Sequence, residues 1–277
     1  MQYTEVDIKL EQIDPFIDIV VARLNEIEFE AFAEDEYGVK AYVKTHLLDK
    51  DAVKEILSEI SDLTELSFSF SKVNKENWNA QWECNYSPVF INENCVIRAN
   101  FHVDVPNLKY EIVINPKMSF GTGHHETTFL MMNEMFDLDF TDKSVLDIGS
   151  GTGILSILAS KLGAHNIVGI DHEEWAFKNS NENVRLNNVD NINFIHGDVN
   201  SIGNQKYDIV LANINRNTII NDMQEYVDRM NTSARILLSG FLSEDIPLIL
   251  NKAEYFGLEL VVLKNKNKWQ MLHMGRV

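Results

Sequence analysis

Cysteine is scarce in this chain of 277 residues, which carries only Cys84 and Cys95. Two cysteines provide neither a disulfide framework nor the paired spacing of a zinc site, and unpaired thiols are typical of a reducing compartment. The chain also lacks a basic N-terminal stretch followed by an apolar core, and no apolar run reaches about 18 residues. We therefore expect a cytoplasmic protein that has no secretion signal and no membrane partner.

Basic residues are also under-represented. The chain has 24 Lys and Arg against 42 Asp and Glu, which gives a formal net charge of −18. The imbalance is largest at the start, where residues 1–85 hold 8 basic and 19 acidic side chains. Such a surface would repel phosphates, so direct binding of nucleic acid is not expected. The charge suits a basic protein partner, but solubility alone also accounts for it, and the composition leaves both explanations open.

The chain does contain a glycine-rich turn between a short apolar run and a helical pattern. Residues 145–148 (Val-Leu-Asp-Ile) are typical of a buried strand, and glycine follows at every second position: Gly149, Gly151 and Gly153. The pattern of residues 154–162 then favours a helix. Glycines let the backbone approach a ligand closely, and the first turn of a helix offers free N–H groups. A strand, a glycine turn and a helix in this order predict a nucleotide-binding site.

Acidic residues follow the next two predicted strands. Residues 166–170 form the second strand, and Asp171 at its end can accept hydrogen bonds from both ribose hydroxyls of an adenosine. Residues 192–195 form the third strand, and Asp198 comes where an acid could meet an adenine amino group. A turn-forming aspartate explains Asp198 equally well. Together, the turn, the second strand and its acid favour a cofactor site over a chance glycine turn.

Strands and helices continue to alternate toward the end of the chain. A fourth strand at residues 207–212 leads directly into Asn213, and a fifth is expected at residues 234–239. The last two strands, at residues 258–264 and 269–274, flank a short polar turn and should form an antiparallel hairpin. The alternation predicts an α/β domain with a parallel sheet and helices on both faces. A closing hairpin is not expected in a dinucleotide-binding domain, which argues against an NAD-dependent oxidoreductase.

The first 74 residues show a different pattern. Their strands and helices follow the order β-α-β-β-α-β, with Asp14 as the expected cap of the first helix. This order predicts a small α+β ferredoxin-like domain at residues 1–74, whose role would be recognition because such a sandwich carries no chemistry of its own. Residues 75–85 are predicted to form a linker helix. Residues 86–277 make up the second domain, which opens with three short strands.

A second unusual stretch covers residues 115–128, with the sequence Asn-Pro-Lys-Met-Ser-Phe-Gly-Thr-Gly-His-His-Glu-Thr-Thr. Its adjacent His124, His125 and Glu126 suggest a metal site. Neighbouring residues rarely ligate one ion, however, and the sequence contains no matching set of zinc ligands elsewhere. We therefore predict that no metal is bound here. A loop that carries Phe120 and two glycines into the start of a helix is better suited to cover a small ligand.

These motifs together resemble the class I S-adenosylmethionine-dependent methyltransferases, and more narrowly the ribosomal protein L11 methyltransferases, or PrmA family. The resemblance is carried by residues 120–128 (Phe-Gly-Thr-Gly-His-His-Glu-Thr-Thr), which are highly specific, together with Leu-Ala-Asn-Ile at 211–214. It spans most of residues 86–277, and the N-terminal domain is similar to the substrate-recognition domain of that family. It implies a Rossmann-like, seven-stranded class I methyltransferase domain with an antiparallel C-terminal hairpin, preceded by the small ferredoxin-like domain.

The resemblance also implies a cofactor, a reaction and a set of site residues. The cofactor is S-adenosyl-L-methionine, and the resemblance implies contacts at Thr128, Gly149, Asp171 and Asn213. The glycine turn and the acid after the third strand add Gly151, Gly153 and Asp198 to the expected contacts. The expected catalytic residues are Asn213, which would hold the target amine, and Phe120, which would lie over the cofactor or that amine. The implied reaction is methylation of lysine ε-amines and of the N-terminal amine of ribosomal protein L11. We expect the enzyme to be a monomer.

Two other functions stay open at the level of sequence. A methyltransferase of this fold could act on another protein or on a small molecule, and a non-catalytic module could retain an inactive cofactor fold. The fourth strand is not followed by Asn-Pro-Pro-Tyr, which argues against methylation of an amide or an adenine. The presence of Gly149, Asp171 and Asn213 argues against an inactive fold.

Overall fold

The computed structural model describes residues 2–72, 86–102 and 105–276. Contacts between Cα atoms divide the chain into two compact units, Met1–Asn85 and Tyr86–Val277. The predicted linker helix at residues 75–85 lies outside the described residues. Within the described ranges, no helix is long and apolar enough to cross a membrane.

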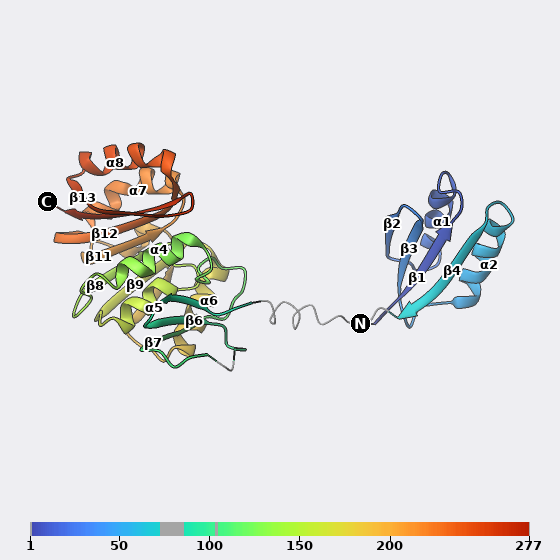
Figure 1. Ribbon diagram of the computed structural model, residues 1–277, viewed down its shortest axis with the longest axis horizontal. Coiled ribbons are helices and arrows are strands. Elements are labelled where there is room, and N and C mark those ends of the chain that lie inside the picture. The colour runs from blue at the N-terminus through green and yellow to red at the C-terminus, as the bar shows by residue number, and fades with distance from the viewer. Residues whose placement is uncertain (1, 73–85, 103–104, 277) are drawn as a thin grey trace. The chain divides into compact units, whose positions relative to one another are not determined.

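The N-terminal unit is a four-stranded antiparallel sheet with two helices on one face (Figure 1). Its elements are β1 (Tyr3–Leu10), α1 (Phe16–Asn25), β2 (Ala31–Asp35), β3 (Gly38–Lys44), α2 (Lys50–Ser61) and β4 (Leu66–Lys72). The strand order is β2-β3-β1-β4, which places β3 and β1 in the centre. Val6 and Ile8 of β1 are fully buried in a core that includes Leu24 of α1 and Leu57 of α2. The element order and the strand order confirm the predicted ferredoxin-like sandwich.

The two helices of this unit begin differently. Asp49 caps α2, because its side chain accepts hydrogen bonds from the backbone N–H groups of Asp51 and Ala52. Helix α1 instead begins after Pro15 without a side-chain cap, so the predicted capping by Asp14 is wrong. A proline is tolerated at a helix start because the N–H group that it lacks has no partner within the helix there.

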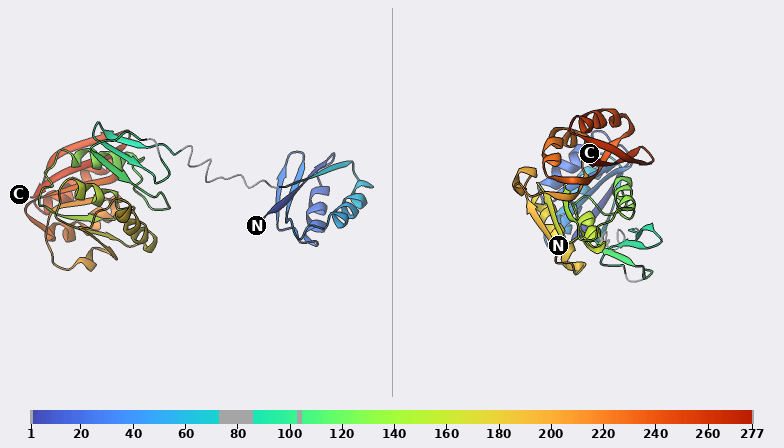
Figure 2. Two further views of the ribbon diagram at one scale, coloured as in Figure 1. Left: turned by 90° about the horizontal axis from the view of Figure 1, so that it is seen from below. Right: turned by 90° about the vertical axis from the view of Figure 1, so that its left-hand side faces the viewer.

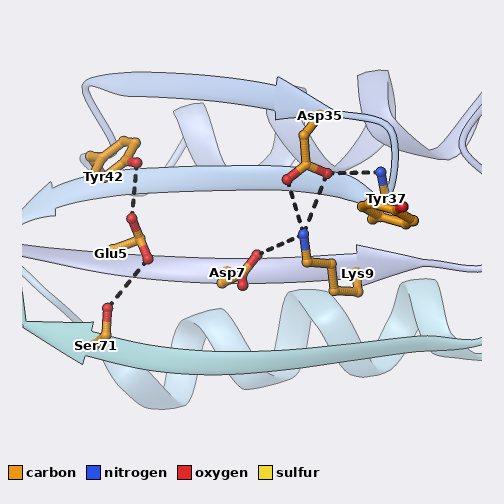
Figure 3. A network of polar contacts seen from close by, with 7 residues as sticks. All are labelled: Glu5, Asp7, Lys9, Asp35, Tyr37, Tyr42 and Ser71. Carbon is orange, nitrogen blue, oxygen red and sulfur yellow. Dashed lines mark hydrogen bonds and ion pairs between the residues drawn. The ribbon is translucent and has the colours of Figure 1, made fainter.

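The face of this sheet that is turned away from the helices carries a polar network (Figure 3). Lys9 of β1 lies 3.0 Å from Asp35 and 3.5 Å from Asp7, and Glu5 accepts a hydrogen bond of 2.9 Å from the Tyr42 hydroxyl. These side chains alternate along β1 with its buried apolar residues, as the two-residue period of a strand requires. The sheet therefore has one apolar face under the helices and one polar face.

The C-terminal unit contains a three-stranded sheet and a seven-stranded sheet. The small sheet consists of β5 (Val89–Asn92), β6 (Cys95–Arg98) and β7 (Tyr110–Val113). The strands of the large sheet are β8 (Ser144–Ile148), β9 (Asn166–Asp171), β10 (Ile192–His196), β11 (Tyr207–Asn213), β12 (Met230–Leu242), β13 (Leu258–Lys266) and β14 (Trp269–Arg276). They lie in the order β10-β9-β8-β11-β12-β14-β13. The first five of this order are parallel, whereas β14 is antiparallel to both β12 and β13, which confirms the predicted closing hairpin.

Helices cover both faces of the large sheet (Figure 1 and, from two other directions, Figure 2). They are α4 (Glu126–Met135), α5 (Ile154–Lys161), α6 (Glu174–Leu186), α7 (Arg216–Asp228) and α8 (Ile246–Tyr255), with two short 3-10 helices, η1 (Val199–Ile202) and η2 (Ser243–Asp245). Val145 of β8 packs in the core that includes α4 and α5, and the next residue, Leu146, packs in the core that includes α7 and α8. Because both faces are buried, the central strands consist mainly of apolar residues.

The strand order places a topological switch between β8 and β11. From β8 the chain proceeds outward through β9 and β10, and then returns to form β11 on the other side of β8. Ligands of open α/β sheets bind outside the carboxyl ends of the strands at such a switch. Gly149 directly follows β8, and Asn213 is the last residue of β11. The fold therefore brings the predicted site residues to the edge of the sheet where a ligand is expected.

Candidate functional site

The glycine turn after β8 has a backbone conformation that favours glycine. Gly149, Gly151 and Gly153 have positive φ angles of 68°, 55° and 79°. A Cβ atom on Gly149 would lie 2.3 Å from Cγ2 of Ile214, and one on Gly151 would lie 2.3 Å from the carbonyl oxygen of Phe120. The turn therefore packs directly against the segment after β11 and against the loop before α4.

Asp171, at the end of β9, is oriented by this turn. The residue is 9% exposed. Its Oδ2 accepts a hydrogen bond from the N–H of Gly151 at 2.8 Å, and its Oδ1 accepts one from the N–H of Glu173 at 3.0 Å. Each carboxylate oxygen has a second lone pair, so the acid can also accept hydrogen bonds from ribose hydroxyls. The structure places Asp171 beside Gly151, and its contact with the cofactor stays a prediction.

The loop before α4 forms a second wall beside the glycine turn. The N–H of Thr152 donates to the carbonyl oxygen of Phe120 at 2.9 Å, and the Thr152 hydroxyl donates to the carbonyl oxygen of Gly121. Phe120 is 49% exposed, and its ring centroid lies 5.1 Å from that of His125. The Phe120 ring is thus exposed to solvent on a backbone that is tied to the turn.

Trp269 belongs to the same region, although the sequence patterns do not indicate it. It is the first residue of β14, and its ring lies 4.8 Å from that of His125. His125 caps α4, because its Nδ1 accepts a hydrogen bond from the N–H of Thr127 at 3.2 Å. Phe120, His125 and Trp269 therefore form an aromatic row. Only the placement of the C-terminal hairpin beside α4 brings Trp269 to this row, so no local motif could have identified it.

Asn213 and Thr128 meet in space although 85 positions separate them in the chain. The Nδ2 group of Asn213 lies 3.4 Å from Oγ1 of Thr128, which is fully buried. The Oδ1 atom of Asn213 is buried and has no hydrogen-bond partner among the described residues. Helix α7 is capped by Asn215, whose Oδ1 accepts from the N–H of Thr218 at 3.0 Å. Asn213 is therefore not a helix cap, and its side-chain oxygen, Oδ1, can accept a hydrogen bond from a ligand.

Asp198 has a local structural role. Its side chain is exposed, caps η1 and accepts a hydrogen bond from the N–H of Asn200 at 2.9 Å. Hydrogen bonds from Asn200, followed by one from Ser201, hold the pKa of Asp198 below its ordinary value. The turn-forming role of this acid is thus visible in the structure, and its contact with adenine stays a prediction.

The two adjacent histidines have different partners. Nε2 of His124 lies 3.0 Å from the carbonyl oxygen of Ser87, whereas His125 caps α4. Within residues 2–72, 86–102 and 105–276, no three His, Cys, Asp or Glu side chains gather in a metal-binding arrangement. The contacts of both histidines are therefore explained by local packing and capping.

Three of the buried polar atoms without partners lie at the same edge of the sheet. In the described part of the chain, Oγ of Ser119, Oγ of Ser150 and Oδ1 of Asn213 are buried and make no hydrogen bond. They belong to the loop before α4, the glycine turn and the end of β11, which pack against one another. An unpaired buried polar atom is costly. The residues at this edge therefore fit a polar ligand with several donors and acceptors, such as the expected cofactor.

Asp147 is a buried acid in β8, two positions before the glycine turn. It is 1% exposed, and its Oδ2 accepts from the hydroxyl of Ser156 at 2.7 Å and from the N–H of Ser156 at 3.2 Å. The pKa of Asp147 is raised to about 6: burial raises it, the Ser156 hydrogen bonds oppose the rise, and the charge of Asp171 makes a smaller contribution to it.

We expect Asp147→Asn to stabilise the protein in the absence of cofactor, because asparagine mimics the neutral acid. The pKa of Asp147 is raised from 3.8 to about 6 in the folded state. The stability that the neutral acid contributes is therefore complete below about pH 4 and is lost as the pH rises through about 6. At about pH 8 the variant should be more stable by up to about 3 kcal/mol, with a smaller gain toward pH 4. Thermal unfolding at both pH values would measure this, and a lower Tm of the variant at the higher pH would contradict it.

Comparison with known proteins identifies the family and the fold. A sequence model of the family described as ribosomal protein L11 methyltransferase (PrmA) matches residues 13–276. A Bacteroides thetaiotaomicron protein named ribosomal protein L11 methyltransferase is 45% identical over 256 residues, which cover 91% of each chain. A Phocaeicola vulgatus protein of the same name is 41% identical over 274 residues, which cover 97% of each chain. The crystal structure of a ribosomal protein L11 methylase from Lactobacillus delbrueckii subsp. bulgaricus has the same fold, with a TM-score of 0.65. The match covers 69% of this chain and 99% of that chain, at 23% sequence identity.

Proposed function

The chain belongs to the ribosomal protein L11 methyltransferase family, and from this premise we propose that it methylates amines of ribosomal protein L11. It is an S-adenosylmethionine-dependent methyltransferase with a class I fold. The proposed acceptors are lysine ε-amines and the N-terminal amine. The observation that carries the proposal is the side-chain oxygen Oδ1 of Asn213, at the carboxyl end of β11 beside Thr128. This oxygen is buried and has no hydrogen-bond partner among the described residues.

The Asn213 carbonyl provides what an amine acceptor needs. When bound, S-adenosylmethionine supplies an electrophilic methyl group on a sulfonium sulfur. Oδ1 of Asn213 can accept a hydrogen bond from a neutral amine and so aim the nitrogen lone pair at that methyl group. An amide does not take up a proton at neutral pH, so the amine must lose its proton to water before it reacts. Asn213 thus acts by positioning the nucleophile, and methyl transfer needs no covalent intermediate on the protein.

The aromatic row defined by Phe120, His125 and Trp269 suits the side chain that carries the amine. The rings of Phe120 and Trp269 both lie within about 5 Å of the His125 ring, centroid to centroid. Aromatic faces attract alkylammonium groups and pack against the methylene chain of a lysine. Phe120, half exposed on a loop that is fixed to the glycine turn, is proposed to contact the entering lysine.

The N-terminal unit is proposed to recognise the substrate. A ribosomal protein contacts RNA phosphates and therefore presents basic surfaces. Residues 1–85, with 8 basic and 19 acidic side chains, are complementary to such a surface. Complementary charges speed encounter and suppress wrong partners. We further propose that the enzyme works in the cytoplasm as a monomer and binds its protein substrate without direct contact to nucleic acid.

Methylation of purified L11 tests the proposal. The full chain, incubated with S-adenosylmethionine and recombinant L11, should add methyl groups that intact-mass spectrometry detects and peptide mapping assigns to amines. L11 whose amines have been acetylated beforehand should receive none. Unmodified L11, together with methylation of another protein or small molecule in an extract, would overturn the substrate and favour the alternative acceptor.

A further inference from the structure

Helix α6 and its C-terminal capping residue carry three buried asparagines at four-residue spacing. Asn179, Asn183 and Asn187 lie on one face of the helix, with exposed fractions of 1%, 0% and 7%. Apolar residues usually occupy such positions, and a buried amide is costly unless it is hydrogen-bonded. The partners of these amides therefore indicate what the helix face does.

Asn187 holds the last strand of the small sheet. Its Oδ1 accepts from the N–H of Val113 at 2.9 Å, and its Nδ2 donates to the carbonyl oxygen of Val113 at 2.7 Å. It also donates to the carbonyl oxygen of Asn183 within α6 at 2.8 Å. These hydrogen bonds link α6 to β7 and to itself, and none of them involves the glycine turn.

Asn183 instead joins the two walls of the cofactor site. Its Oδ1 accepts from the N–H of Asn115 at 2.8 Å, at the start of the loop that carries Phe120. Its Nδ2 donates to the carbonyl oxygen of Thr152 in the glycine turn at 2.9 Å. One planar amide thus spans the distance between the loop and the turn.

The loop is anchored at two points, at its start at Asn115 and further along at Phe120. At its start, the carbonyl oxygen of Asn115 accepts from Asn179 at 3.2 Å, and the Asn115 side chain donates to Glu182 at 2.8 Å. At Phe120 the loop returns to the turn through the hydrogen bond from the N–H of Thr152. Thr152 is therefore held through its N–H by the loop and through its carbonyl by Asn183.

We propose that Asn183 is a positioning residue for S-adenosylmethionine. It fixes the spacing between the Phe120 loop and the glycine turn, so its loss would let these two walls shift relative to one another. A displacement of about 1 Å can cost on the order of a hundredfold in rate. The proposal rests on the cofactor of the family and is independent of the protein substrate.

Asn183→Leu and its matched control, Asn187→Leu, test the proposal through cofactor affinity. Each change replaces an amide by an apolar side chain of similar size. Asn183→Leu removes the hydrogen bonds to the N–H of Asn115 and the carbonyl oxygen of Thr152. Asn187→Leu removes those to the N–H and carbonyl oxygen of Val113 and a third to the carbonyl oxygen of Asn183, which still accepts from the backbone N–H of Asn187. We expect the two variants to lose similar amounts of thermal stability. The Kd for S-adenosylmethionine, measured by calorimetry, should rise about tenfold or more in Asn183→Leu and less than about threefold in Asn187→Leu.

Asn183→Asp serves as a second variant if Asn183→Leu does not fold. It keeps the acceptor for the N–H of Asn115 and removes the donor to Thr152, so the Kd should again rise by about tenfold. A Kd that rises equally in the Asn183 and Asn187 variants would reduce Asn183 to a stability element. An unchanged Kd in a folded Asn183 variant would also overturn the proposal.

Discussion

Replacement of Asn213 by alanine is expected to lower the rate of methyl transfer by about a hundredfold or more, with a much smaller change in cofactor affinity. The reason is the buried Oδ1 atom, which makes no hydrogen bond within the described residues. Alanine removes the acceptor that orients the amine, whereas the glycine turn and Asp171 stay in place. Single-turnover kinetics with saturating S-adenosylmethionine would measure the transfer step, and calorimetry would measure the cofactor Kd.

Asn215→Ala is the matched control for this experiment. Asn215 lies two positions further along and caps α7 through Thr218. Loss of that cap should lower stability by about 1 kcal/mol and leave the transfer rate of the folded enzyme unchanged. If Asn213→Ala transferred methyl groups at the normal rate, or lost rate only in proportion to its stability as Asn215→Ala would, the positioning role would be excluded.

The features that the sequence predicted correctly are those that depend on neighbouring residues. Whether a residue packs inside a strand or ends it can be judged from a few adjacent residues, and this was enough to place β8, β9 and the glycine turn. The closing hairpin was equally local, because its strands flank a short polar turn. The alternation of strands and helices also predicted the parallel sheet with helices on both faces. The strand order itself was not predicted, and it places Gly149 and Asn213 at one edge of the sheet.

The features that the sequence could not predict depend on tertiary packing. The Asn213–Thr128 contact spans 85 positions, and Asn183 reaches Thr152 across 31. A buried asparagine in a helix has no recognisable local signature, because its partners are backbone groups of segments that arrive only when the sheet is complete. Asp198 shows that a local sequence pattern can also be ambiguous. Its pattern fitted both a turn and a ligand contact, and the hydrogen bond to Asn200 establishes only the turn.

Removal of residues 1–85 is expected to leave cofactor binding intact and to lower kcat/KM for ribosomal protein L11 by about a hundredfold or more. Each unit has its own core in the described part of the chain: the cluster that contains Val6 and Ile8 is formed by residues of the first unit, and the other two clusters are formed by residues of the second unit. The C-terminal unit should therefore fold alone. All site residues lie in residues 86–277, so the fragment should bind S-adenosylmethionine with the Kd of the full chain.

A short lysine peptide distinguishes recognition from support of the active site. Such a peptide reaches the site without docking on the N-terminal unit, so the fragment 86–277 and the full chain should methylate it at similar rates. With intact L11, the advantage of the full chain should shrink as salt is added, because exposed charges separated by more than about 10 Å are screened at 0.1 M ionic strength. Equal rates of the two enzymes on L11 would show that the N-terminal unit is not the recognition element. An equal loss of rate on the peptide and on L11 would instead mean that this unit supports the catalytic site.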